Sequence, residues 1–162
     1  MIIKPKKGSK TKLSFTICNL FYQKFNLKIS PTEYITEYKS CEYKSLTIHT
    51  FNNCKNSIFK NCYVRSKNCY FKIEKLFMFN NKMYAIVKQF ETNNVNLDYK
   101  QTKYLLPWMH CIYPAKEPQL NLILVEDIDD LCIYIHNDGI ETIDKIAGLK
   151  CDLIIDHFIK AN

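Results

Sequence analysis

A chain of 162 residues is long enough for one domain with an extension, and 47% hydrophobic residues allow it to build a core. Aromatic residues make up 14% and there are three glycines, a composition that favours strands. The formal net charge of +7 favours anionic partners, although five lysines fall in the first twelve residues and leave about +2 for the rest. No apolar run approaches the ~20 residues of a transmembrane helix, so we expect no membrane partner.

The cysteine count is even, which raises the question of a disulfide framework. Lysines follow residues 1–3 directly, so the chain does not open like a secretory signal peptide. We therefore expect reduced thiols, several of them buried as small apolar side chains, in an intracellular and nuclear protein. The eight cysteines are Cys18, Cys41, Cys54, Cys62, Cys69, Cys111, Cys132 and Cys151.

Residues 1–10 are predicted to be a flexible basic tail, because Pro5 and Gly8 interrupt regular structure. Such a tail contacts phosphates or directs nuclear localisation, and a solubilising end is the alternative interpretation. Its candidate nucleic-acid contacts are Lys4, Lys6, Lys7 and Lys10.

Residues 11–40 are predicted to be an N-terminal helical segment. Over residues 11–25, Leu13, Ile17, Leu20 and Phe21 follow helical spacing. A second apolar stripe is typical of a helix packed between two surfaces, and it consists of Phe15, Cys18, Tyr22 and Phe25. Ser30-Pro31-Thr32-Glu33 has the form of a capping box and predicts a short helix over residues 31–39.

Residues 41–162 are predicted to form a β-barrel-like domain of short strands. The fold class expected is mainly β (α+β), with a small curled antiparallel sheet or a partly open barrel and one or two N-terminal helices. Apart from one hairpin, apolar patterns predict strands over residues 44–51, 57–64, 120–125, 131–136 and 149–155.

The strongest local signal is that hairpin, in which residues 68–79 and 83–91 flank Asn80-Asn81-Lys82. Asparagine tolerates the positive φ that tight hairpin turns require. On the first of these strands we expect Phe71, Ile73, Phe77 and Phe79 to share one face.

Residues 92–118 have weak periodicity and are predicted to be a long loop. The segment contains three prolines and the only tryptophan, and long loops in compact domains are often functional. The candidate ligand or partner contacts on this loop are Tyr104, Trp108, His110 and Tyr113.

The sequence lacks the motifs that are typical of catalytic and metal-binding sites. The sequence has no phosphate loop, nucleophile elbow or HExxH pattern, so we do not expect an enzyme and assign no catalytic residue. Zinc sites bring ligands in close pairs such as C-x2-C, which is absent, so no metal and no cofactor is predicted. A cysteine and histidine zinc site built from Cys54, Cys62 and Cys69 with His49 stays open as an alternative.

Nucleic-acid binding by the folded body is a further alternative. Arg65, Lys67 and Lys72 are its candidate contacts, because aromatic residues lie between and beside them, as in surfaces that stack bases. Aromatic residues that alternate along a strand also form cores, and these are Tyr63, Tyr70 and Phe71.

From Glu37 onward, about 120 of the 162 residues resemble the β-rich region that follows the nuclease part of transposase-like proteins. The segments that carry the resemblance are Glu37-Tyr38-Lys39-Ser40, Asn61-Cys62-Tyr63-Val64, Tyr70-Phe71-Lys72-Ile73, Tyr84-Ala85-Ile86-Val87-Lys88-Gln89-Phe90, Leu122-Ile123-Leu124-Val125 and Leu149-Lys150-Cys151. The hairpin and the strands after it also look like a bromo-adjacent homology module, a β-rich chromatin reader. The resemblance implies peptide or nucleosome binding and transfers no catalysis.

The first functional hypothesis is therefore a non-catalytic binding module of a transposon-derived protein that contacts protein or chromatin through the long loop. The second is a nucleic-acid-binding domain that uses the basic and aromatic residues. The third is a zinc protein. No small-molecule substrate is predicted.

Overall fold

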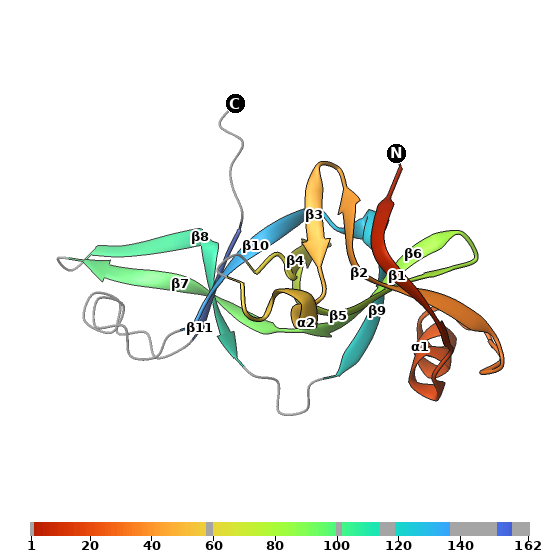
Figure 1. Cartoon of the computed structure of the whole chain (residues 1–162). Helices are drawn as coiled ribbons and strands as arrows, with labels where there is room; N and C mark the ends of the chain where they lie inside the picture. The colour runs from red at the N-terminus through yellow and green to blue at the C-terminus, as the bar shows by residue number, and fades with distance from the viewer. Residues whose placement is uncertain (1, 58–59, 100–101, 114–118, 137–151, 157–162) are drawn as a thin grey trace.

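The computed structural model describes the chain except for residues 1, 58–59, 100–101, 114–118, 137–151 and 157–162. The described part is mostly β, with one large antiparallel sheet that is curled but not closed, and two α-helices (Figure 1). This confirms the mainly β fold class. Within the described residues, neither helix is long and apolar enough to cross a membrane.

The elements follow one another as β1 (Lys4–Lys12), α1 (Phe15–Phe25), β2 (Tyr34–Tyr43), β3 (Leu46–His49), α2 (Phe51–Cys54), β4 (Tyr63–Ser66), β5 (Cys69–Phe79), β6 (Lys82–Gln89), β7 (Glu91–Tyr99), β8 (Thr102–Tyr113), β9 (Leu120–Leu124), the 3-10 turn η1 (Val125–Asp127), β10 (Asp130–Ile135) and β11 (Asp152–Asp156). The strand order is β1-β2-β5-β4-β10-β11-β8-β7, and β3 pairs with β2. β6 lies between β5 and β9.

The predicted hairpin is the β5–β6 pair. Asn80 and Asn81 form its turn with φ values of 48° and 60°, the left-handed conformation that asparagine tolerates best after glycine. The register of β5 against β6 shifts between Ile73 and Lys75. Such a bulge reverses the side-chain alternation beyond it, so Leu76 faces the same side as Phe71 and Ile73, whereas Phe77 and Phe79 face the opposite side.

Two hydrophobic clusters result from this reversal. Phe71 and Ile73 pack in a cluster enclosed by the curled sheet, whereas Phe77 and Phe79 pack in a second cluster under α1. The prediction that these four side chains share one face was wrong, because a one-residue bulge has no signature in the hydrophobic pattern.

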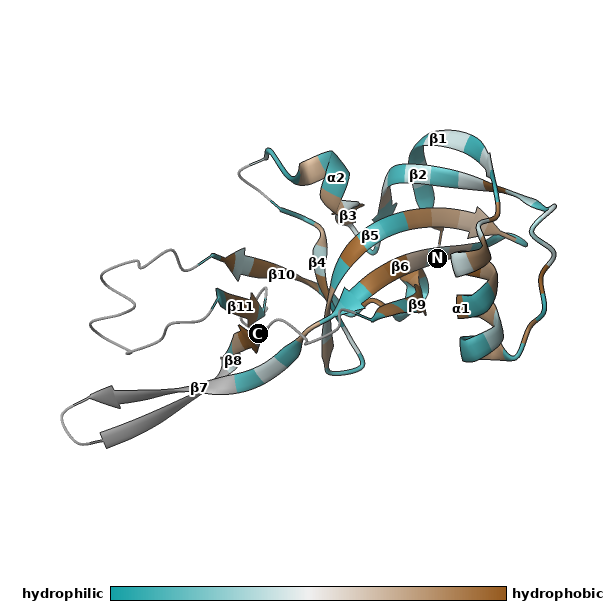
Figure 2. Ribbon diagram, turned by 90° about the horizontal axis from the view of Figure 1, so that it is seen from below, coloured by the Kyte–Doolittle hydropathy of each residue, from teal (hydrophilic) through white to brown (hydrophobic). Residues whose placement is uncertain are grey.

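Helix α1 covers the second cluster and confirms the helix predicted over residues 11–25 from Phe15 onward, whereas Thr11 and Lys12 belong to β1. Ser14 caps its start by accepting from the Ile17 N–H, and Asn26 ends it at φ 53°. Ile17, Leu20 and Phe21 are buried, and the Phe21 ring meets the rings of Phe77, Phe79 and Tyr84 at centroid distances of 6.0, 5.4 and 4.9 Å. Figure 2 shows α1 beside β6 and β9.

Two predictions for the N-terminal third were wrong. Residues 4–12 of the expected flexible tail form β1, which pairs with β2 over its length. The expected helix over residues 31–39 is instead the start of β2, since the Ser30 hydroxyl accepts from the Thr32 N–H in a tight turn that does not continue as a helix.

The predicted loop over residues 92–118 was also wrong. Residues 92–99 and 102–113 belong to a long hairpin of β7 and β8 that extends away from the body, on the left in Figure 1, and residues 100–101 and 114–118 lie outside the described part. Tyr104, Trp108, His110 and Tyr113 therefore lie on strand β8. The strand expected over residues 57–64 is confined to β4 and begins only at Tyr63.

Candidate functional site

The net positive charge of the chain comes from its N-terminal 32 residues. The first 32 residues contain seven lysines and no acidic residue, so the remaining 130 contain 16 basic and 16 acidic side chains and carry no net charge. Exposed apolar side chains gather in the same region. Of eight large hydrophobic side chains exposed in the described part, six fall in the first 34 residues: Ile2, Phe15, Tyr22, Phe25, Leu27 and Tyr34.

Strand β1 arranges four of these lysines in a row. Lys4, Lys6, Lys10 and Lys12 occupy alternate positions of an edge strand, interrupted at Gly8, and all four are exposed. Alternate residues of a strand point to the same face and lie about 7 Å apart. The row is therefore a line of positive charge along the edge of the sheet.

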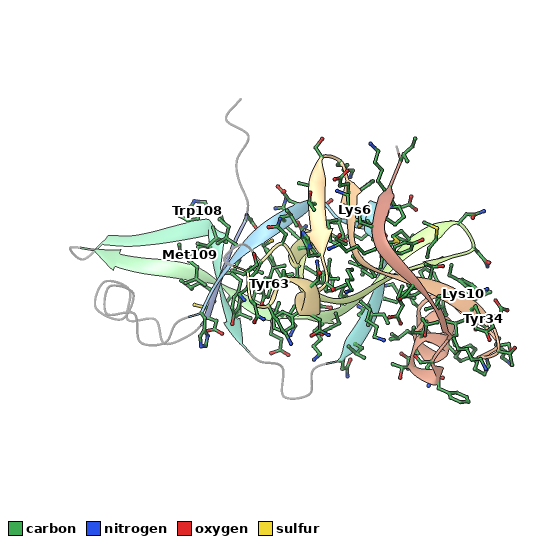
Figure 3. The ribbon with its side chains drawn as sticks, in the orientation of Figure 1. Lys6, Lys10, Tyr34, Tyr63, Trp108 and Met109 are labelled. Atoms are coloured by element: carbon green, nitrogen blue, oxygen red, sulfur yellow. The ribbon has the colours of Figure 1, made fainter. Side chains whose placement is uncertain are left out.

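Two tyrosines of β2 lie on the same face as this row. Tyr34 is paired with Lys12 and Tyr38 with Gly8, and directly paired residues of antiparallel strands project to one side of the sheet. The Nζ atoms of Lys10 and Lys12 lie 4.9 and 5.9 Å from the centre of the Tyr34 ring. We call Lys4, Lys6, Lys10 and Lys12 together with Tyr34 and Tyr38 the β1 lysine face; Figure 3 labels Lys6, Lys10 and Tyr34.

Most of the charge on this face is not neutralised by the protein. Lys6 forms an ion pair with Glu42, and this contact lowers the pKa of the Glu42 carboxyl. The charge of Lys4, which is paired with Glu42 across the two strands, lowers that pKa further. Among the described residues no carboxylate lies within ion-pair distance of Lys4, Lys10 or Lys12. The positive charge of β1 also acts on His49 of β3. Burial lowers the pKa of His49, and the charges of Lys6 and Lys7 lower it further.

This arrangement suits an anionic polymer with flat bases. Lysine ammonium groups bind phosphates as point charges, and exposed tyrosine rings stack bases of any identity. Tyr38 lies beside the gap in the row at Gly8, and Tyr34 lies beside Lys12, so an extended nucleic-acid strand along β1 passes both lysines and rings. Tyr34 is exposed and Tyr38 is half-buried.

The cations predicted on the body are arranged differently, because each has a carboxylate partner. Arg65 Nη1 lies 3.5 Å from Asp156, Lys67 Nζ lies 3.4 Å from Asp127, and Lys72 Nζ lies 3.0 Å from Glu74. Lys72 also lies over the Phe51 ring at 4.3 Å and is largely covered. The aromatic residues beside them are core residues, with Tyr63, Tyr70 and Phe71 all buried.

The partner contacts predicted on β8 are only partly available. Trp108 is half-buried, and His110 is buried. Tyr104 and Tyr113 lie on the strand, and their side chains are outside the described residues. Figure 3 places Trp108 at the opposite end of the molecule from Lys10 and Tyr34.

His110 belongs to a polar network that joins the β7–β8 hairpin to the body. The Tyr70 hydroxyl donates to Asp156 Oδ1 at 2.7 Å and lies 2.7 Å from His110 Nε2, and Arg65 completes the set through Asp156. Burial and the bond to Asp156 raise the pKa of Tyr70. Burial lowers the pKa of His110, against the Asp156 charge that raises it. A tyrosine held protonated is a structural donor in this network.

The cysteine-rich region brings Cys54 and Cys62 together. The two thiols are free, and the Cys62 thiol is hydrogen-bonded to the Cys54 thiol. Burial and this hydrogen bond both raise the pKa of Cys62. In the part of the chain that the structure describes, no group of three His, Cys, Asp or Glu side chains is placed to hold a metal ion.

Sequence reasoning found Lys4, Lys6 and Lys10 but missed what they lie next to. Tyr34, Tyr38 and Lys12 of the lysine face were not predicted as contacts. The period-two spacing of Lys4, Lys6, Lys10 and Lys12 was the available signal for a strand. No protein-family model, curated protein or solved structure matches this chain.

Proposed function

We propose that this protein is a non-catalytic binding module that holds single-stranded nucleic acid along the β1 lysine face. The observation that carries the proposal is a row of exposed lysines beside the rings of Tyr34 and Tyr38 on one face of two paired strands, in which Lys10 and Lys12 have no described carboxylate within ion-pair distance. Single-strand-binding proteins combine a basic track for the backbone with aromatic side chains for the bases.

The distribution of charge supports this face over the body. Each candidate cation of the body forms an ion pair within the protein: Arg65 with Asp156, Lys67 with Asp127 and Lys72 with Glu74. A phosphate would have to displace the carboxylate in each pair. Lys10 and Lys12 have no described carboxylate within ion-pair distance, and Lys4 shares Glu42 with Lys6. Binding to these lysines releases the counterions of the polymer, which makes the affinity depend on salt.

The test is fluorescence anisotropy with a labelled oligothymidylate of about eight nucleotides, a length within the range of about 4 to 16 nucleotides that single-strand-binding folds cover. Affinity is measured between about 50 and 200 mM salt for the wild-type chain and for Lys10→Gln/Lys12→Gln. Each phosphate contact contributes about 0.7 to the slope of log affinity against log salt, so the variant should lose about 1.4.

The matched control is Lys55→Gln/Lys82→Gln, which removes the same charge from exposed positions of the body. It should shift the affinity slightly and leave the slope within about 0.3 of the wild-type value. A wild-type slope near zero, or an equal loss of slope in both variants, would reject the β1 lysine face as the binding site.

Contact with a protein or chromatin partner through Tyr104, Trp108, His110 and Tyr113 stays a prediction, as do the transposon origin and the nuclear location. The burial of His110 in the network with Tyr70 and Asp156 favours a structural role for that residue.

A further inference from the structure

Three two-residue hairpin turns of the described structure share one backbone conformation. Lys44-Ser45 joins β2 to β3, Lys67-Asn68 joins β4 to β5, and Asn80-Asn81 joins β5 to β6; all six residues have φ between 48° and 65°. This left-handed conformation favours asparagine and glycine, and other residues adopt it at a cost in free energy. Of these three turns, Lys44-Ser45 is the one that contains neither asparagine nor glycine.

The side chains of this turn are therefore not explained by the backbone. An ammonium group and a hydroxyl group occupy positions at which the conformation selects against both residues. Lys44 and Ser45 are also exposed, so packing in the core does not explain them either. Residues held in sparsely populated conformations are concentrated at binding and active sites, which makes this turn a candidate binding site.

The turn borders a hollow of about 650 Å³ in the surface of the sheet. Lys4, Glu42 and Thr47 lie in one row across β1, β2 and β3, and they line the hollow together with Lys44 and Ser45. The hollow thus has two lysines and two hydroxyl-bearing residues in its wall. Figure 1 shows the β2–β3 turn at the same end of the sheet as the N-terminus, where β1 begins.

The charges at this hollow favour a small anion that carries more than one negative charge. Glu42 forms an ion pair with Lys6 and lies opposite Lys4, so the lysines Lys4, Lys6 and Lys44 exceed the one carboxylate by two charges. Among the described residues no carboxylate lies within ion-pair distance of Lys44. Its Nζ atom lies 4.8 Å from the centre of the Tyr43 ring, which also lines the hollow.

We infer that this hollow binds a terminal phosphate of the nucleic-acid strand that lies along the β1 lysine face. The inference rests on the proposed function and deepens it, because it names the part of the strand that is held here. Lys4 belongs to both the lysine row and the hollow, so a strand that follows the row reaches the hollow with its end.

The chemistry of a strand end distinguishes it from the rest of the strand. A terminal phosphate is a monoester with a charge of about −1.5 to −2 at pH 7 and three strong acceptor oxygens. A phosphate within the strand has one negative charge. The excess of two positive charges and the hydroxyl groups of Ser45 and Thr47 fit the monoester better than the diester.

The experiment measures the fluorescence anisotropy of oligothymidylates of about eight nucleotides with a 5′-phosphate, a 3′-phosphate or neither, each labelled at the opposite end. Hydrogen bonds to charged groups contribute more than neutral ones. A phosphate at one end should therefore raise the affinity on the order of tenfold over the strand that lacks it.

Lys44→Asn/Ser45→Gly should change binding and stability in opposite directions. It removes the ammonium and hydroxyl groups, so the gain from the terminal phosphate should fall below about threefold. It also introduces the residues that the turn conformation favours, so Tm should rise by about 2–4 °C. A lower Tm would mean that Lys44 and Ser45 serve the fold, and it would reject the inference.

Lys82→Gln is the matched control for the lost charge. Lys82 is an exposed lysine beside the Asn80-Asn81 turn, and it does not line the hollow. This variant should retain the full gain from the terminal phosphate. An equal loss of the gain in Lys82→Gln would show that the gain reports the overall charge of the protein, and it would also reject the inference.

The outcomes separate the inference from the function on which it rests. Failure of all the oligonucleotides to bind rejects the proposed function. Salt-dependent binding that neither terminal phosphate strengthens, or a full gain in Lys44→Asn/Ser45→Gly, rejects the inference alone. A phosphoserine peptide of the same length presents the same monoester without a nucleic-acid strand. Binding of that peptide as tight as that of the phosphorylated strand would overturn the inference and assign the hollow to a phosphorylated protein.

Discussion

The ring of Tyr38 lies over Gly8, in the space that a side chain at position 8 would fill. A Cβ atom on Gly8 would stand 2.5 Å from Cε1 and 2.9 Å from Cδ1 of that ring, and 3.0 Å from Cγ2 of Thr36. Tyr38 also packs against the main hydrophobic cluster, so its ring has little freedom to retreat. The absence of a side chain at Gly8 is thus what lets a tyrosine lie in the middle of the lysine row.

Gly8→Ala is therefore expected to destabilise the protein although position 8 is exposed. The added methyl group must displace a ring held by the core, and overpacking of this kind costs about 1–3 kcal/mol. Urea unfolding followed by circular dichroism measures the change in the free energy of unfolding.

A double-mutant cycle identifies the cause. In a Tyr38→Ala background the contacts with the ring are gone and the contact with Cγ2 of Thr36 at 3.0 Å remains, so Gly8→Ala should there cost much less than in the wild-type chain. An equal cost in both backgrounds would mean that the backbone of Gly8, and not the Tyr38 ring, opposes a side chain.

Tyr70→Phe should weaken the joint between the body and the β7–β8 hairpin. The substitution removes the hydroxyl that bonds Asp156 and contacts His110, and leaving buried polar groups with fewer partners costs about 1–3 kcal/mol. Urea unfolding gives the cost, and hydrogen exchange should show faster opening of β8 and β11 than of β5 and β6.

Tyr22→Phe is the control for this change, because Tyr22 is half exposed on α1. Its effect should stay within about 0.5 kcal/mol, as for most surface substitutions. A cost for Tyr70→Phe no larger than that of Tyr22→Phe would show that the network does not hold the hairpin.

The parts of the fold that the sequence predicted are those governed by local chemistry. Asn80 and Asn81 specify their turn by tolerating positive φ, and the strands on either side follow from it. Helix α1 was predicted from its apolar spacing, and the Ser14 cap that the structure shows is a further local signal that the prediction did not use.

The parts that could not be predicted depend on pairing between distant residues. β1 contains Pro5 and Gly8 and shows no apolar face, and it becomes a strand only because residues 34–42 lie beside it. The β7–β8 hairpin contains asparagines and Pro107, which have low strand propensity, so its pattern predicted a loop. The β1 lysine face could not be predicted for the same reason, since Tyr38 lies beside Gly8 only because β1 and β2 pair.

Native-state alkylation should divide the cysteines by burial. Burial raises the pKa of Cys41 to about 12, so almost none of its thiol is ionised near pH 7.5, and only the thiolate reacts. Cys62 is buried as well, and its pKa is raised by burial and by the Cys54 thiol. Cys18 and Cys69 are half exposed.

Iodoacetamide followed by peptide mass spectrometry is expected to modify Cys18 and Cys69 in the folded protein, and Cys41 and Cys62 only after unfolding. The same experiment in urea provides the reference rate for each cysteine. Equal rates for Cys41 with and without urea would contradict the packing of β2 described here.

The stability of the fold should fall as the pH decreases from about 7.5 to about 5.5, because two histidines resist protonation in the native state. Burial lowers the pKa of His110, with a further contribution from the Arg65 charge and opposition from Asp156. Burial and the charges of Lys6 and Lys7 lower the pKa of His49. Below the ordinary histidine pKa of 6.5 the unfolded chain therefore binds protons that the native protein excludes.

The sign follows from this difference in proton uptake. When the unfolded state binds more protons, the free energy of unfolding rises with pH, so it falls as the pH drops through 6.5 towards the native pKa values. Each histidine contributes at most about 1.4 kcal/mol per pH unit. The lowered pKa of Glu42 acts only below its ordinary value of 4.5 and does not interfere in this range.

His110→Gln should flatten this dependence even if it also lowers stability at about pH 7.5, since glutamine does not titrate. Urea unfolding at several pH values measures the slope separately from the overall stability. A slope in His110→Gln as steep as in the wild-type chain would mean that His110 takes up its proton without opening the network of Tyr70 and Asp156. The β7–β8 hairpin would then stay joined to the body in acid, and its hydrogen exchange would show no increase there.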